Sequence, residues 1–135
     1  MDNINLVDHL LSCNSITIYV NGNTQTYDNE SDTYNTILET LKNITKNSHE
    51  MPALGVSLDK ETREALNKDM WLELNYNDTI EYLDMPFNKL TIKLEKDSYG
   101  INIIRHSNNK YEGRCYYLNL DVDTNKLYET ILKTQ

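Results

Sequence analysis

The sequence predicts an α+β fold, in which a mostly antiparallel sheet has three to four helices packed on one of its faces. Three patterns lead to this prediction: an Asn-Gly turn between two short N-terminal strands, a C-terminal meander of alternating apolar residues, and several segments of helical periodicity. At 135 residues, the chain is expected to form one domain, residues 1–135, whose core needs neither a metal nor a disulfide.

The first predicted elements are a short helix and a β-hairpin. Apolar residues within 4–11 recur at helical spacing, which indicates an N-terminal helix. Residues 16–20 then alternate as in a strand, and Asn21-Gly22 follows, which is the strongest short-range signal for a hairpin turn. The returning strand, residues 24–27, is polar, so we expect it to lie at an edge of the sheet.

A long amphipathic helix is predicted after Ser31. Ser31 or Asp32 can cap its N-terminus, and Lys42 and Lys46 complement the negative end of its dipole. Its apolar stripe at helical spacing consists of Tyr34, Ile37, Leu38, Leu41 and Ile44.

The middle of the chain predicts a connector, a shorter helix and another strand. Residues 49–58 form the connector, with room for a short strand, and Asp59 is expected to cap a helix over residues 60–70. The even-numbered residues of the strand 70–76 are apolar or aromatic and should share one face. A turn at residues 77–78 then leads into a further strand segment.

Proline 86 is expected to end that further segment, because proline cannot donate a hydrogen bond to a neighbouring strand. The next turn is predicted at Asp97-Ser98. A two-residue turn there places Ile92 opposite Ile103, and opposed residues share one face of a sheet.

A second turn at residues 108–109 extends the meander. It places Cys115 opposite Asn102, and it places Arg105 opposite Glu112, where the two could form a partly buried ion pair. Both turns predict the same apolar face, made of Leu90, Ile92, Leu94, Ile101, Ile103, Tyr116, Leu118 and Leu120.

The chain is expected to close with a helix near residues 124–133, capped by Asp123. Its predicted buried stripe is Thr124, Leu127, Tyr128, Ile131 and Leu132.

Composition and charge limit the classes of function. The net charge is −8, which disfavours direct binding of nucleic acid or of an anionic membrane surface and favours a protein partner with a basic surface. No secretory pattern or membrane-spanning run is found, so a cytoplasmic location with reduced cysteines is expected. Abundant Asn, Ile, Lys and Tyr suggest an AT-rich bacterial or phage genome.

Cys115 is the one candidate for nucleophilic catalysis, and it is a weak one. His106 faces Tyr111 across the second turn, four residues along the strand from Cys115. At about 3.3 Å per residue the two side chains lie roughly 13 Å apart, whereas a nucleophile and its base need about 3 Å. A structural cysteine is the favoured interpretation.

No metal or cofactor site is predicted. His9 and Cys13 are four residues apart on a helix, but two ligands do not make a site. The stretch from Asp121 resembles the start of a calcium loop, yet Lys126 replaces the required glycine and Leu132 the required bidentate glutamate.

What remains is a surface for binding. The sheet face that points away from the helices is predicted to carry Trp71, Asn102, His106, Tyr111 and Tyr117, and Tyr and Trp are enriched at binding hot spots. The leading hypothesis is therefore an immunity-type or inhibitor protein whose acidic side chains occlude a basic site on another protein. The alternatives are a thiol-dependent enzyme that uses Cys115, and a small-molecule-binding module with its ligand between the sheet face and the N-terminal hairpin.

Overall fold

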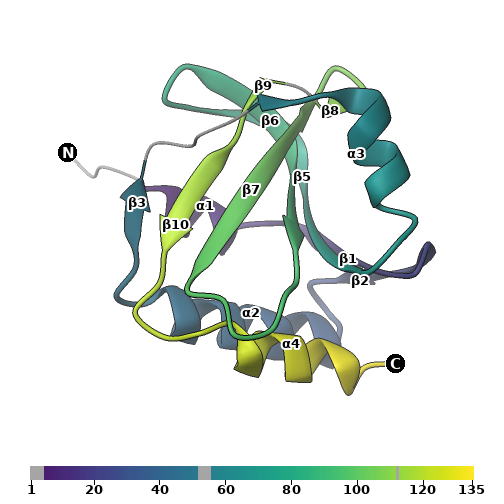
Figure 1. Cartoon of the computed structure of the whole chain (residues 1–135), viewed down its shortest axis with the longest axis vertical. Coiled ribbons are helices and arrows are strands. Elements are labelled where there is room, and N and C mark those ends of the chain that lie inside the picture. Colours follow the sequence, from purple (N-terminus) through teal and green to yellow (C-terminus); the bar gives the residue numbers. More distant parts are fainter. Residues whose placement is uncertain (1–4, 52–55, 112) are drawn as a thin grey trace.

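The computed structural model describes residues 5–51, 56–111 and 113–135, and it has the predicted α+β architecture (Figure 1). An antiparallel sheet has the strand order β2-β1-β5-β6-β7-β10-β3, with β8 paired to β7, and β4 pairs separately with β9. The elements are α1 (Leu6–Leu10), β1 (Ser15–Val20), β2 (Asn23–Asp28), α2 (Asp32–Thr45), β3 (His49–Met51), β4 (Val56–Ser57), α3 (Asp59–Ala65), β5 (Met70–Tyr82), β6 (Met85–Lys93), β7 (Gly100–Ser107), β8 (Lys110–Tyr111), β9 (Gly113–Arg114), β10 (Tyr116–Asn119) and α4 (Asn125–Leu132).

The N-terminal elements form as predicted, and local chemistry explains each boundary. The side chain of Asn5 accepts a hydrogen bond from the backbone of Asp8, which caps α1. Asn21 and Gly22 both have positive φ, as the tight turn between β1 and β2 requires, and β2 is an exposed edge strand. Ser31 Oγ accepts from the first-turn amides of α2, so Ser31 is the cap.

Three helices share one core with the sheet. Apolar side chains of α1, α2 and α4 pack against the same face of β1, β5, β6, β7 and β10, and α2 and α4 lie side by side (Figure 1). Burying one aliphatic side chain contributes about 1.5–3 kcal/mol, so this core dominates the stability of the fold. Its fully buried members include Leu6, Leu10, Ile16, Ile37, Leu41, Leu72, Leu74, Ile92 and Ile103.

The helix α3 covers the opposite face of the sheet, which we call the outer face. There Leu66, just after α3, packs with Trp71 and Tyr111 in a second, smaller buried cluster. The prediction that Asp59 caps this helix is wrong: the N-cap residue is Leu58, and Asp59 lies in the first turn. The helix also ends at Ala65 rather than at residue 70, because Met70 begins β5.

The strands β5 and β6 form a long hairpin, and its outer end, beyond the pairing with β1 and β7, is a two-stranded ribbon that the sequence did not reveal. The predicted turn at residues 77–78 is wrong, because β5 continues to Tyr82 through a change of register between Asn75 and Ile80. The chain reverses instead at Leu83 and Asp84, which both have positive φ. Pro86 does not end the strand, since it lies near the hairpin end of β6, where a missing N–H is tolerated.

The meander has the predicted faces but not the predicted register throughout. Ile92 does lie opposite Ile103, and the turn at residues 108–109 does place His106 opposite Tyr111. The last strand is shifted by two residues, so that Tyr117, not Cys115, lies opposite Asn102. Every residue of the predicted apolar face is nevertheless buried, because a shift of two preserves the face.

The shift arises where the chain leaves the main sheet. Gly113 and Arg114 form β9 and pair with Ser57 and Val56 of β4. The predicted meander had assigned these two residues to the strand that pairs with β7. Gly113 has positive φ, and a Cβ on it would lie 2.5 Å from a nitrogen of the buried Arg105 guanidinium. The predicted ion pair of Arg105 involves Glu112, which lies outside the described residues.

The C-terminal helix α4 also forms as predicted, with small differences. Its N-cap residue is Thr124, although Asp123 Oδ1 accepts a hydrogen bond from the amide of Asn125. Leu127 and Ile131 are buried, whereas Leu132 is exposed, contrary to the predicted stripe. None of the helices in the described ranges is long and apolar enough to cross a membrane.

Candidate functional site

Three of the five predicted binding residues lie beneath α3 and are buried. Trp71, His106 and Tyr111 are 5%, 5% and 3% exposed. The indole nitrogen of Trp71 donates to the carbonyl of Lys68, and the ring of His106 packs edge-on against Tyr111. The sequence correctly placed these side chains on the outer face, but they pack against one another and α3 there rather than meeting solvent.

A buried carboxylate organises this region. Glu73 is 1% exposed and accepts hydrogen bonds from the hydroxyls of Tyr111 at 2.5 Å, Thr91 at 2.8 Å and Tyr19 at 3.1 Å. The ammonium of Lys89 lies 3.6 Å from the same carboxylate. We call these five residues the Glu73 cluster, and sequence analysis missed it because Glu73 is an isolated acid within an apolar strand.

Burial changes the acid–base behaviour of the groups around Glu73. Desolvation, reinforced by the negative charge of Glu73, raises the pKa of Tyr19 to about 12, and it also raises the pKa of Tyr111. Desolvation, together with the nearby charge of Lys89, lowers the pKa of His106. His106 Nδ1 lies 2.8 Å from Asn88 Oδ1, so the ring is fixed by a second strand.

The Glu73 cluster is best described as a structural network. Among the described residues, every buried polar side-chain atom has at least one hydrogen-bond partner, so the buried groups of the cluster satisfy one another. Asp59 extends the network: its carboxylate accepts from the amide of Tyr111 and pairs with Arg63, which fixes the start of α3 over the sheet.

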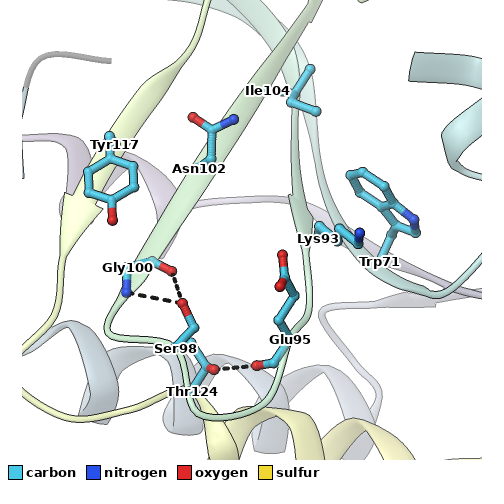
Figure 2. A pocket seen from close by; sticks show the side chains of 9 residues that line it. All are labelled: Trp71, Lys93, Glu95, Ser98, Gly100, Asn102, Ile104, Tyr117 and Thr124. Carbon is cyan, nitrogen blue, oxygen red and sulfur yellow. Dashed lines mark hydrogen bonds between the residues drawn. The ribbon is translucent and has the colours of Figure 1, made fainter. Parts of the chain in front are cut away.

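The other two predicted residues, Asn102 and Tyr117, border an open hollow beside α3 (Figure 2). We call it the outer hollow, and its volume is about 320 Å³. Figure 2 shows the amide of Asn102 on β7 and the carboxylate of Glu95, in the loop after β6, facing this space, with Lys93 and the edge of Trp71 opposite Tyr117. The lining is completed by Ser98, Gly100, Ile104 and Thr124.

Tyr117 depends on a glycine for its position. Its ring lies across Gly100 on the neighbouring strand, and a Cβ on Gly100 would lie 1.8 Å from the Tyr117 hydroxyl oxygen. An aromatic ring that covers a strand glycine replaces the packing that the glycine lacks. Ser98 Oγ donates to the carbonyl of Gly100 and accepts from its amide, which fixes the turn under the ring.

Cys115 lies outside the outer hollow. It is 6% exposed, and its sulfur lies 3.1 Å from the hydroxyl oxygen of Ser57 on β4. The prediction that Cys115 lies opposite Asn102 is wrong, because Asn102 pairs with Tyr117 instead. Cys13, the other thiol, is buried, and desolvation raises its pKa to about 11.

His9 and Cys13 do not converge on one site. The ring of His9 packs against Tyr82 and Phe87, while the Cys13 sulfur lies near the Tyr34 hydroxyl. No group of three His, Cys, Asp or Glu residues able to hold a metal ion occurs in residues 5–51, 56–111 and 113–135.

A second concave surface was not anticipated from the sequence. It lies between the edge strand β3 and the turn of the β5–β6 ribbon, has a volume of about 410 Å³, and we call it the edge groove. Sequence reasoning missed it because it depends on the ribbon, whose turn was predicted six residues too early. The groove is lined by Glu50, Met51, Leu83, Met85, Arg114, Cys115 and Tyr116.

Comparison with known proteins adds no assignment to this geometry. No protein-family model matches the chain, and neither the curated proteins nor the solved structures include a match to it.

Proposed function

We propose that this chain is a small acidic protein that works in the cytoplasm by binding another protein and covering a basic site on it, as an inhibitor or immunity-type protein does. Two free cysteines, Cys13 and Cys115, are consistent with a reducing compartment. The net charge of −8 favours a basic protein surface over nucleic acid as the partner.

The observation that carries this proposal is the uncompensated negative surface. Within the described residues, the acidic side chains that form ion pairs are Asp59, Asp69 and Glu73. Exposed acidic residues outside those pairs include Asp28, Glu30, Asp32, Glu39, Glu50, Asp78, Glu81 and Asp84. Such a field attracts a basic partner from a distance, which raises the association rate and lowers the affinity for anionic competitors.

The test begins with capture of a partner from an extract of the native host, followed by association kinetics with that purified partner. The association rate should fall about tenfold or more between low and high ionic strength, because salt screens exposed charges. Replacing Glu30, just before α2, and Glu39, on α2, by glutamine should slow association. The matched change of Lys42 and Lys46 to glutamine at the C-terminal end of α2 should accelerate it. An association rate that changes neither with ionic strength nor with these substitutions would contradict the proposal.

The outer hollow supports a second candidate function, a module that binds a small polar molecule. Its volume of about 320 Å³ lies at the lower end of the range for ligand pockets, about 300–1,000 Å³. It lies among β6, β7 and β10 rather than at the N-terminal hairpin, where a ligand was expected. A screen of polar metabolites by thermal shift would test this function. A true ligand should stabilise the wild type but not an Asn102→Ala, Tyr117→Phe double variant.

A further inference from the structure

The turn at the tip of the β5–β6 ribbon has an unexpected residue. Left-handed backbone conformations in two-residue hairpin turns favour Asn, Asp and Gly. This chain follows the rule at Asn21-Gly22 and at residues 108–109, where all four residues have positive φ. At the ribbon tip it places Leu83 at a φ of 54°, followed by Asp84 at 62°. Turn stability alone therefore does not account for a leucine at this position.

The Leu83 side chain is not used for packing in the core. It is 61% exposed, and it lines the edge groove. Across the groove on β3, Met51 is 46% exposed, and Val56, which pairs with the groove residue Arg114, is 65% exposed. Exposed apolar side chains gathered around a concave surface are typical of binding sites.

Acidic side chains flank this apolar surface. Asp84 lies next to Leu83 in the turn, Glu81 is exposed two residues before it, and Glu50 lines the groove from β3. The hydroxyl of Tyr82 donates to Glu50 at 3.1 Å, so this carboxylate is held where the ribbon meets β3. Among the described residues that line the groove, Arg114 is the one basic side chain. The charge therefore complements a segment that carries more than one basic side chain.

The edge groove is preformed in the free protein. Tyr116 lies in its lining, and its hydroxyl donates to the carbonyl of Tyr82 at 2.9 Å and lies 3.3 Å from that of Met85. These bonds join β10 to both sides of the ribbon turn. A preformed surface lowers the entropic cost of binding.

We infer that the edge groove binds a segment of the partner protein in which an apolar side chain is flanked by basic side chains, and that Leu83 is its principal apolar contact. The apolar side chain enters between Leu83 and Met51, and the basic side chains pair with Glu50, Glu81 or Asp84. This inference rests on the proposed function, since it assigns the surface and the partner chemistry through which that function is carried out.

The decisive variant is Leu83→Asn, because asparagine suits the turn and cannot replace the apolar contact. The probe is a synthetic peptide with one leucine between pairs of lysines, compared with the same peptide carrying serine in place of leucine. Titration followed by NMR should shift the methyl signals of Met51, Leu83 and Met85 with the leucine peptide. Affinity should fall at least fivefold with the serine peptide, and again with Leu83→Asn.

The matched control is Val122→Asn, which changes an equally apolar side chain that is 46% exposed outside the groove. It should leave the peptide affinity unchanged. Equal affinities for the two peptides, or an undiminished affinity in Leu83→Asn, would overturn the inference. Because asparagine suits the turn, we expect the melting temperature of Leu83→Asn to be no lower than that of the wild type. Loss of peptide binding in this folded variant then supports the inference.

The partner captured from the host separates this inference from the proposed function. A partner that associates in a salt-dependent manner but binds Leu83→Asn as tightly as the wild type would overturn the groove while leaving the proposed function intact. The opposite result is also informative. If the groove binds the leucine peptide but the rate of association with the partner does not depend on salt, the inference about the groove stands, and the proposal that acidic side chains cover a basic site is contradicted.

Discussion

The phenolic hydroxyl of Tyr111 donates to a carboxylate oxygen of Glu73 at 2.5 Å, and both side chains are buried between the sheet and α3. The two residues lie 38 positions apart in the sequence, on β8 and β5. Their contact therefore joins the short turn after β7 to a central strand, and it anchors the region that α3 covers.

Removing that hydroxyl should destabilise the protein without disrupting the fold. Tyr111→Phe takes one donor from a buried carboxylate that keeps Thr91 and Tyr19, so the free energy of unfolding should fall by about 1–3 kcal/mol. Tyr27→Phe is the control, because the hydroxyl of Tyr27 donates to the side chain of Gln25 on an exposed edge strand. Its effect in the same urea titration should stay below about 0.5 kcal/mol. Equal effects of the two changes would show that the buried bond adds nothing.

His106 should make the stability sensitive to mild acid. Burial and the charge of Lys89 lower its folded-state pKa below 6.5, whereas the unfolded chain binds a proton near 6.5. The stability that His106 contributes is therefore complete above pH 6.5 and is lost as the pH falls through the folded-state pKa. His106→Asn should flatten this part of the stability–pH profile.

The control for this titration is His49→Asn, since His49 is exposed on β3. The part of the slope that is lost in His106→Asn should be retained in this variant. His9, whose pKa burial also lowers, keeps a residual slope in both variants. An unchanged slope in His106→Asn would contradict the assignment of the pH dependence to His106.

The helix α3 is expected to open before the main core does. Few apolar contacts hold it on the sheet, and the chief one is the packing of Leu66 against Trp71. Because Trp71 is the one tryptophan of the chain, its fluorescence reports on this contact. Leu66→Ala should cost about 2–5 kcal/mol if α3 unfolds with the sheet, and less if it detaches on its own. We expect detachment, seen as a red shift of Trp71 emission at urea concentrations below the main transition in far-ultraviolet circular dichroism, because α3 contributes only seven helical residues to that signal.

Leu58→Ala is the matched change at the N-cap of the same helix, where the side chain is 60% exposed. It should leave both signals as in the wild type. Coincident fluorescence and circular dichroism transitions in Leu66→Ala would mean that α3 and the sheet unfold as one unit.

The elements whose signals are local were predictable from the sequence. The turn at Asn21-Gly22, the cap at Ser31 and the apolar stripe of α2 depend on neighbours a few residues away, and each formed as expected. The ribbon was not predictable, because Asn77 and Asp78 carry turn signals while Leu83 carries none. Pairing with β6, a tertiary effect, overrides these local preferences.

The candidate site was predictable only in part, for a related reason. Alternation correctly assigned Trp71, Asn102 and Tyr117 to the outer face, and all three line the outer hollow. The alternation of side chains along a strand assigns each residue to a face of the sheet, but it does not show which element packs on that face. The burial of His106 and Tyr111 under α3 could therefore not be foreseen. The excursion of β9 to pair with β4 likewise moved Cys115 away from the neighbours that its spacing implied.

The contact between Tyr117 and Gly100 gives the last prediction. A methyl group on Gly100 would lie 1.8 Å from the Tyr117 hydroxyl oxygen, so Gly100→Ala must displace the ring. The φ of Gly100 lies outside the left-handed region, so alanine itself fits the backbone and the cost comes from the clash. We expect a loss of about 1–3 kcal/mol, as for overpacking elsewhere.

A double-mutant cycle isolates this contact. In a Tyr117→Ala background the ring is absent, so Gly100→Ala should cost less than about 0.5 kcal/mol, which leaves a coupling energy near or above about 1 kcal/mol. The readout is the free energy of unfolding of the four proteins in urea. Additive effects would mean that the ring does not lie over Gly100 in solution, and the wall of the outer hollow that Tyr117 forms would then be lost. A strong coupling would instead establish that Gly100 positions Tyr117, and a ligand screen against the hollow should then use Gly100→Ala as its altered-site control.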